Sequence, residues 1–125
     1  ALPNTRITAV TILTSLTAAD LKAIGYVGEP MEAVTRLAKL SVEAGARAIV
    51  CSPMEVAAVR AVVPADITLI TPGVRPAGAD AGDQARVATP QQAIAEGANL
   101  VVIGRPITGA SDVAQAAREI GASLL

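Results

Sequence analysis

The chain has 125 residues, the usual size of one small domain, and a near-neutral charge from ten basic and eleven acidic residues. Hydrophobic residues make up 52% of it, but it contains no Phe, Trp or His and only one Tyr, so its core must be built from Val, Ile, Leu and Ala. The absence of His excludes a Ser-His-Asp triad and imidazole metal ligands, and the single cysteine, Cys51, excludes an intrachain disulfide.

The first half of the chain alternates strand-like and helix-like patterns. The predicted elements are a strand at 7–13, a helix at 17–24, a longer helix at 30–44 and a short apolar strand at 48–51. Thr17 is the expected N-cap of the first helix, and Gly25 and Gly45 are the expected stops of the two helices.

The second half continues the same alternation. The predicted elements are a helix opened by Ser52-Pro53, a strand at 67–70, a helix from Thr89-Pro90 to Gly97, a strand at 100–103 and a last helix capped by Ser111. Strands that alternate with helices over short connections favour parallel strands with helices packed outside them. No linker divides the chain, so we expect residues 1–125 to form a single unit. An independent, open four-stranded α/β sheet is the alternative that this pattern leaves open.

Residues 71–87 form the longest segment without a helix or strand pattern, and they follow the third predicted strand directly. This end of a parallel strand is where ligands bind in α/β folds. Arg75 lies beside the strand end and Gln84 further along, which favours a ligand-binding loop. A solvated Gly/Pro connection is the plainer alternative.

The fourth predicted strand ends in a second loop of similar composition, with Gly104 and Arg105 before Pro106. Glycine lets an anion approach the backbone closely, and the arginine fork matches phosphate oxygens. Two such loops after the last two strands fit the phosphate site of (β/α)8 barrels. The alternative is that Arg105 pairs with a structural carboxylate such as Asp112.

Other polar residues at the predicted strand ends carry weaker signals. Thr14 and Ser15 follow the first strand and offer hydroxyls to a polar ligand, although Ser15 is as well suited to cap the next helix. Cys51 ends the second strand and is interpreted as inert packing. Both lysines, Lys22 and Lys39, fall within predicted helices, so no Schiff-base lysine is expected, and no metal site is expected either.

Composition also limits partners and location. Balanced charge and the lack of aromatic residues argue against nucleic-acid binding. The longest run without a charge, residues 7–19, is too short and too rich in threonine to span a membrane. Without a visible secretory signal and with a lone cysteine, we expect a cytoplasmic protein.

Together these motifs resemble orotidine 5′-phosphate decarboxylase of the bacterial type. The matching segments, in order, are Ala9-Val-Thr-Ile-Leu-Thr-Ser15, Val50-Cys-Ser52, Thr71-Pro-Gly-Val-Arg-Pro76, Gly82-Asp-Gln84, Arg86-Val87, Thr89-Pro90 and Val102-Ile-Gly-Arg-Pro-Ile-Thr108. The resemblance covers nearly the whole chain and implies the C-terminal half of a TIM (β/α)8 barrel, namely its strands 5–8 with their outer helices.

The resemblance also implies the function and the site. Enzymes of this family convert orotidine 5′-phosphate (OMP) to UMP and CO2, in pyrimidine biosynthesis, without metal or organic cofactor. The residues that it assigns to phosphate are Arg75, Gln84, Gly104 and Arg105. Thr14, Pro72 and, less certainly, Ser15 would lie near the pyrimidine.

The sequence departs from the family in lacking its catalytic Asp-x-Lys-x-x-Asp motif. We therefore expect no catalytic residue in this chain, and no turnover by the 125 residues alone. Half a barrel leaves two sheet edges and an apolar face exposed. The expected partners are OMP or UMP and either the missing N-terminal half or a second copy, as a homodimer.

Two alternatives stay open at this point. One is a non-catalytic, self-associating, phosphate-binding half-barrel. The other is a different phosphate-binding barrel enzyme, such as a sugar-phosphate decarboxylase or epimerase, although these usually need an acidic metal site or a rim base.

Overall fold

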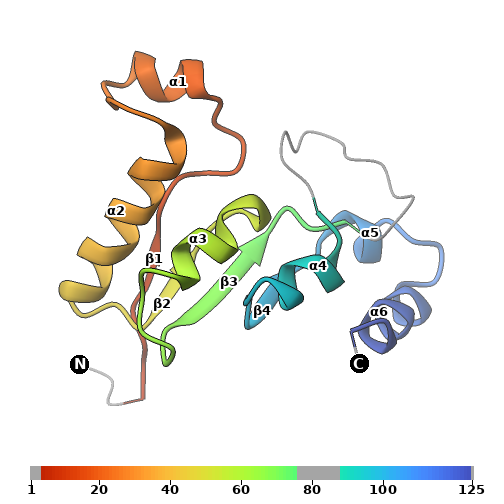
Figure 1. Cartoon of the computed structure of the whole chain (residues 1–125). Helices are drawn as coiled ribbons and strands as arrows, with labels where there is room; N and C mark the ends of the chain where they lie inside the picture. Colours follow the sequence, from red (N-terminus) through yellow and green to blue (C-terminus); the bar gives the residue numbers. More distant parts are fainter. Residues whose placement is uncertain (1–3, 76–87, 125) are drawn as a thin grey trace.

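The computed structural model describes residues 4–75 and 88–124. The elements in chain order are β1 (Thr8–Val10), α1 (Ala18–Ala23), α2 (Pro30–Glu43), β2 (Ala48–Val50), the 3-10 helix η1 (Pro53–Glu55), α3 (Val56–Arg60), β3 (Thr68–Pro72), α4 (Pro90–Ala95), β4 (Leu100–Val102), α5 (Arg105–Thr108) and α6 (Val113–Ala122). Every strand is followed by at least one helix, as Figure 1 shows.

The four strands form one parallel sheet in the order β1-β2-β3-β4. Val10, Val50, Ile70 and Leu100 lie at one level across it, because each is paired with the next. The predicted arrangement of parallel strands with outer helices is confirmed. Sequential strands lie side by side and all point the same way, so their carboxyl ends meet at one edge.

The helix boundaries follow local chemistry that the sequence made visible. Thr17 caps α1, since its backbone N–H donates to Asp20 Oδ2 at 2.8 Å and its Oγ1 accepts from the Asp20 N–H at 3.2 Å. Thr89 caps α4 in the same way. Gly25 and Gly45, the predicted stops, both have positive φ angles, which residues with a side chain rarely adopt.

Three local predictions were wrong. Ser111 does not cap the last helix, because the Asp112 carboxylate does so by accepting from the Gln115 N–H at 2.8 Å. Arg105–Thr108, expected to be loop, forms the short helix α5. The strand predicted at 7–13 is limited to Thr8–Val10.

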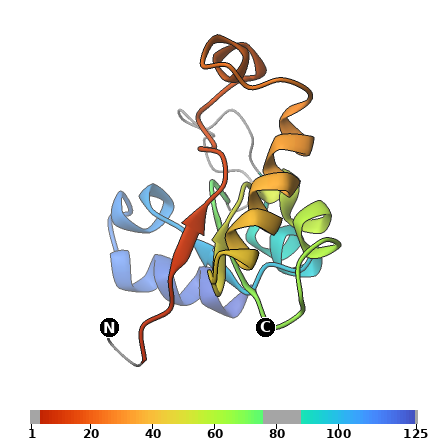
Figure 2. The same ribbon diagram turned by 90° about the vertical axis from the view of Figure 1, so that its left-hand side faces the viewer.

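The core lies between one face of the sheet and the helices α2, α3 and α4 (Figures 1 and 2). Ile49 and Leu69 point to this face and are fully buried, as are Val34 of α2 and Val56 and Val59 of α3. Burying each such aliphatic side chain contributes about 1.5–3 kcal/mol. The helices therefore hold the sheet from one side.

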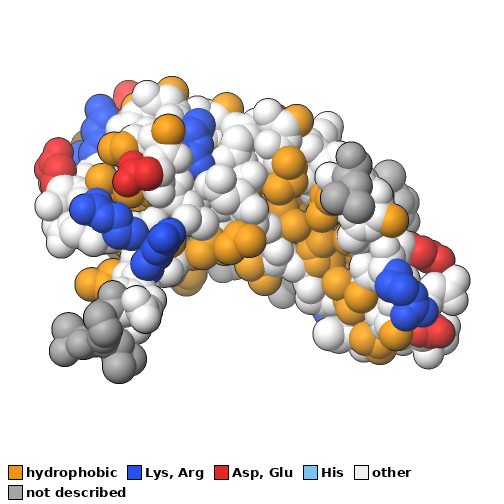
Figure 3. Space-filling model, turned by 90° about the horizontal axis from the view of Figure 1, so that it is seen from below, with side chains coloured by type: hydrophobic (Ala, Val, Ile, Leu, Met, Phe, Trp, Pro, Cys, Tyr) orange, Lys and Arg blue, Asp and Glu red, His pale blue; other side chains and the backbone are white. Residues whose placement is uncertain are grey.

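The opposite face of the sheet is left uncovered by the described residues. Along the strands the side chains on this face alternate with those that point to the core, and we use the name open face for six of them: Val10, Val50, Ile70, Pro72, Leu100 and Val102. Val10, Leu100 and Val102 are 55%, 54% and 50% exposed. In Figure 3 the molecule is an arc, with hydrophobic side chains gathered along its inner curve. Parallel sheets are normally covered on both faces, so this one is incomplete by itself.

The pair α5 and α6 forms the far end of the arc. The two helices pack on each other, and neither contains a buried residue. No helix within 4–75 or 88–124 has the length and apolar character needed to cross a membrane.

Candidate functional site

The carboxyl edge of the sheet gathers the polar residues that the sequence singled out. Short segments leave the strands at this edge, and parallel α/β folds bind ligands there. Gln84, one of the predicted ligand residues, lies outside the described residues. The other six predicted residues can be placed.

The two predicted phosphate loops leave neighbouring strands at the same level. Pro72 of β3 is paired with Val102 of β4. Arg75 and Arg105 each lie three residues beyond this pair along the chain, so the two arginines follow neighbouring strands at equal spacing. This alignment depends on the strand register, which the sequence alone does not show. It brings two arginine-bearing segments to the same edge of the sheet.

The loop after β3 is anchored at its start. Gly73 has a φ angle of +79°, a conformation that favours glycine, and it turns the chain out of the strand. Val74 is fully buried and forms an isolated bridge with Ala88. The Arg75 N–H donates to the Ala88 carbonyl oxygen at 3.0 Å, which fixes the backbone of this half-buried arginine.

The loop after β4 is open above Gly104. A Cβ atom placed on Gly104 would meet no atom of residues 4–75 or 88–124 within 4 Å, so this part of the chain leaves the Gly104 backbone uncovered on that side. The Gly104 carbonyl oxygen accepts from Ile107 N–H at 2.8 Å and from Thr108 N–H at 3.0 Å. These bonds close the turn of α5, which presents Arg105 as its exposed first residue. Among the described residues, the backbone at Gly104 is therefore open to an approaching anion.

Thr14 and Ser15 lie at the β1 end of the same edge. Because β2 separates β1 from β3, these residues are two strands away from Pro72. Thr14 is half-buried and Ser15 is exposed. Thr17, and not Ser15, caps α1, so the capping role suggested as an alternative for Ser15 is wrong.

The end of β2 adds a buried carboxylate that the sequence analysis missed. Glu55 is fully buried, and its Oε2 accepts from the Ser52 N–H at 2.9 Å. The Ser-x-x-Glu spacing of a capping box was the available signal. Cys51 is also fully buried. Loss of solvent is the main cause, and the nearby Glu55 carboxylate the second, of a rise in the pKa of its thiol to about 12. A thiol so disposed is a poor nucleophile, in line with its interpretation as packing.

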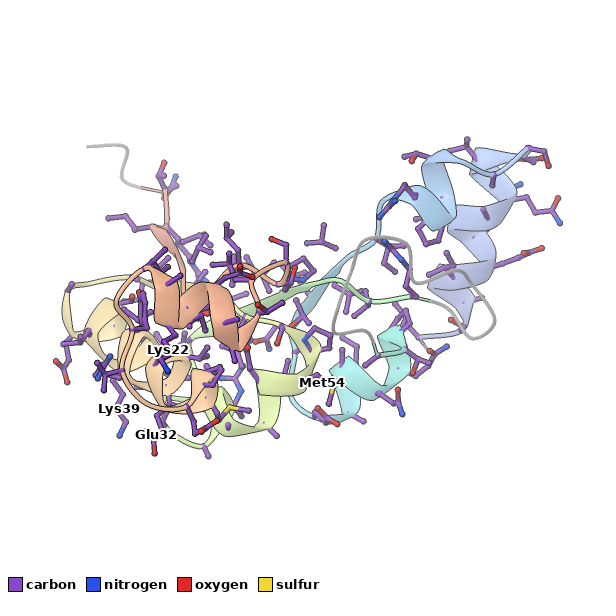
Figure 4. The ribbon with its side chains drawn as sticks, turned by 90° about the horizontal axis from the view of Figure 1, so that it is seen from above. Lys22, Glu32, Lys39 and Met54 are labelled. Carbon is purple, nitrogen blue, oxygen red and sulfur yellow. The ribbon has the colours of Figure 1, made fainter. Side chains whose placement is uncertain are left out.

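The lysines lie away from the arginine loops. Lys22 of α1 and Lys39 of α2 are at the opposite end of the arc from α5 in Figure 4. Asp20-Leu21-Lys22 matches the first half of an Asp-x-Lys-x-x-Asp motif, but Gly25 stands at the last position and Asp20 serves as a helix cap. Within 4–75 and 88–124, no three His, Cys, Asp or Glu residues are grouped as metal ligands would be.

Four parallel strands with helices outside them, and loops that leave the carboxyl edge, are the arrangement of half of a (β/α)8 barrel. A sequence profile of the orotidine 5′-phosphate decarboxylase / HUMPS family matches residues 1–120. The chain therefore belongs to this family.

Relatives of known name show how much of the protein this chain represents. It is 64% identical over 124 residues to an orotidine 5′-phosphate decarboxylase of Thermobifida fusca, covering 99% of this chain and 53% of that protein. The Frankia casuarinae enzyme of the same name is 59% identical, with 99% of this chain and 45% of that protein covered. The chain thus spans about half the length of the relatives it matches.

Solved structures also match this chain over about half of their own length. Orotidine 5′-phosphate decarboxylase from Lactobacillus acidophilus superposes with a TM-score of 0.81 at 34% identity, over 95% of this chain and 49% of that one. The enzyme of the same name from Pyrococcus horikoshii, at 20% identity, has a TM-score of 0.69 over 95% of this chain and 50% of that one, which supports the fold alone. The fold is thus half of a TIM barrel.

Proposed function

We propose that this chain is the C-terminal half of an orotidine 5′-phosphate decarboxylase, and that it supplies the loops that bind the substrate phosphate. The observation that carries the proposal is the alignment of the two loops: Arg75 and Arg105 follow the paired residues Pro72 and Val102 at equal distance along the chain. The relatives' shared name supplies the reaction, conversion of OMP to UMP and CO2.

Each predicted residue has a role in this proposal. Arg75 and Arg105 donate to the phosphate oxygens as forked, permanently charged groups, and the open backbone at Gly104 allows close approach. Gln84 supplies a further hydrogen bond from the loop that follows Arg75. Thr14, Ser15 and Pro72 lie nearer to the pyrimidine, at the rim between β1 and β3.

The catalytic carboxylates and lysine are proposed to come from the other half of the barrel. This sequence has no Asp-x-Lys-x-x-Asp motif, so the 125 residues alone are expected to be inactive. No metal or organic cofactor takes part in the proposed reaction. Phosphate binding remote from the reacting carboxylate contributes to the rate when it is used to order the site.

The test is binding of UMP and uridine to a chimera. The N-terminal half of the Thermobifida fusca relative would be joined to this chain, and both ligands measured by calorimetry. UMP should bind more tightly than uridine, and Arg105→Ala and Arg75→Ala should each weaken UMP binding roughly 10–100-fold while leaving uridine binding unchanged. Arg36→Ala, an exposed arginine on α2, is the matched control. Equal binding of UMP and uridine, or UMP binding that is insensitive to both loop arginines, would contradict the proposal.

A further inference from the structure

The hydrogen bonds between β1 and β2 end at a defined residue, Thr11. Its N–H donates to the Val50 carbonyl oxygen at 3.2 Å, and its Oγ1 donates to the same oxygen at 2.9 Å. In a parallel ladder, the carbonyl oxygen of such a residue regularly accepts from the N–H two residues further along the partner strand, which here is Ser52. The Ser52 N–H donates instead to Glu55 Oε2 at 2.9 Å. The Glu55 carboxylate therefore takes the place of the next acceptor in the ladder.

Burial distinguishes Glu55 from the other side chains that make the same local hydrogen bond. Asp20 accepts from the Thr17 N–H and Gln92 accepts from the Thr89 N–H, each three residues back, and both are exposed to solvent. Glu55 is fully buried. At an exposed turn, water can replace either partner of the bond, whereas a buried N–H that loses its acceptor pays the full cost of desolvation. The bond from Glu55 is therefore the one that the local structure can least do without.

This bond lies beside the residues expected near the pyrimidine. The chain after β1 continues to Thr14 and Ser15, while β3, on the other side of β2, ends at Pro72. Thr14 follows Thr11 by three residues. The point at which the β1–β2 ladder ends therefore sets where Thr14 and Ser15 begin their course along the rim.

We propose that Glu55 is a positioning residue for the pyrimidine side of the substrate site. By accepting from the Ser52 N–H, its carboxylate ends the ladder at Thr11 and lets the following segment leave the sheet. Because Glu55 is fully buried, it acts through the backbone and does not contact the substrate itself. The nature of the ligand in this inference rests on the proposed function, whereas the end of the ladder does not.

The test compares three substitutions of Glu55 in the chimera that carries the N-terminal half of the Thermobifida fusca relative. Glu55→Gln keeps an oxygen at the same reach, Glu55→Asp keeps the charge on a side chain one methylene shorter, and Glu55→Ala removes the acceptor. The ligands are uridine, which has no phosphate, and ribose 5-phosphate, which has no pyrimidine, and their binding is measured by calorimetry.

The expected result is a selective loss on the pyrimidine side. Glu55→Asp and Glu55→Ala should each weaken uridine binding about 10-fold, because a misplaced rim contact is lost, and should keep ribose 5-phosphate binding within about twofold of the unmodified chimera. Glu55→Gln should bind both ligands like the unmodified chimera. Glu96→Ala, which removes an exposed carboxylate at the end of α4, is the matched control and should change neither affinity.

This pattern separates positioning from general stability, because a loosened fold lowers the affinity for both ligands. Equal losses of uridine and ribose 5-phosphate binding would overturn the proposal. Unchanged uridine binding in Glu55→Asp, or a loss in Glu55→Gln as large as that in Glu55→Asp, would overturn it too. If Glu55→Ala does not fold, the comparison of the Gln and Asp variants decides the same question.

An NMR measurement without ligand keeps this test distinct from that of the proposed function. The amide resonances of Thr14 and Ser15 should move in Glu55→Asp and stay in place in Glu55→Gln. A chimera that binds neither UMP nor ribose 5-phosphate would defeat the proposed function, and these resonances would still test the positioning role. Thr14 and Ser15 amides that do not move in Glu55→Asp would overturn it.

Discussion

Loss of the Arg60 side chain is expected to destabilise the fold without touching the candidate site. It extends from the end of α3 to the amino ends of β3 and β4. Its Nη1 donates to the Ile67 carbonyl oxygen at 3.0 Å, and its Nη2 donates to the Gly97 carbonyl oxygen at 3.1 Å and to Asn99 Oδ1 at 2.7 Å. Asn99 Oδ1 also accepts from the Leu69 N–H at 2.8 Å, so one network ties the two strands that carry the arginine loops.

The magnitude follows from these three short bonds. A hydrogen bond to a charged group contributes about 1.5–3 kcal/mol when it is buried. Because Arg60 is only half-buried, about 1 kcal/mol for each bond is the better figure. Arg60→Met keeps the apolar stem that packs against Gly97, and should lower the free energy of unfolding by about 3 kcal/mol.

Urea denaturation at a fixed protein concentration measures this change, since any dimer makes stability depend on concentration. Arg36→Met, at an exposed position on α2, is the matched control and should shift the free energy by less than about 0.5 kcal/mol. Arg60→Lys should recover only part of the loss, because an ammonium group cannot reproduce the forked geometry. If Arg60→Met unfolds at the same urea concentration as the control, the network does not stabilise the sheet and the reasoning is wrong.

Three further predictions concern single groups. The Thr71 hydroxyl is buried, and among the described residues it has no hydrogen-bond partner of good geometry, only the weakly accepting Cys51 thiol nearby. Thr71→Val should therefore leave the urea midpoint unchanged or raise the free energy of unfolding by up to about 1–2 kcal/mol. A clear loss of stability would contradict this. Burial raises the pKa of the Cys51 thiol from 9.0 to about 12, so Ellman's reagent should label this thiol only when the chain unfolds. The free energy of unfolding should fall as the pH rises from 9.0 towards 12, because the thiol of the unfolded chain ionises first. Fast labelling of the native chain at neutral pH would refute the burial of this thiol. Hydrogen bonds from Thr17 hold the pKa of the Asp20 carboxyl below 3.8. The contribution of Asp20 to the stability of α1 should therefore be present above pH 3.8 and lost as the pH falls through the lowered pKa. A midpoint at or above 3.8 in an NMR titration of Asp20 would contradict the capping interaction.

Local chemistry made much of the fold predictable from the sequence. Thr17 and Thr89 are followed three residues later by side chains that complete a capping box, and Gly25 and Gly45 mark helix ends by a conformation that other residues avoid. The parallel order of the strands follows from the alternation of short apolar runs with helices. These features depend on neighbours in the chain, which a sequence displays directly.

The features that the sequence did not reveal depend on tertiary contacts or on a choice between equivalent neighbours. Ser111 and Asp112 are both good caps, and only the observed hydrogen bond to Gln115 distinguishes them. The burial of Glu55 requires the surrounding elements to be in place. The equal spacing of Arg75 and Arg105 from a strand pair becomes visible only with the register of β3 and β4. The motif resemblance implies that both arginines belong to one site, and the strand register is consistent with that expectation.

The central claim is that this chain is the phosphate-binding half of a decarboxylase whose catalytic residues lie in the other half. Loss of OMP absorbance should be measured with the chimera that carries the N-terminal half of the Thermobifida fusca relative, and in parallel with the 125-residue chain alone. The account predicts conversion of OMP to UMP and CO2 by the chimera, a marked rise in KM in its Arg105→Ala variant, and no turnover by the chain alone. A folded chimera without activity, or turnover by the isolated chain, would contradict it.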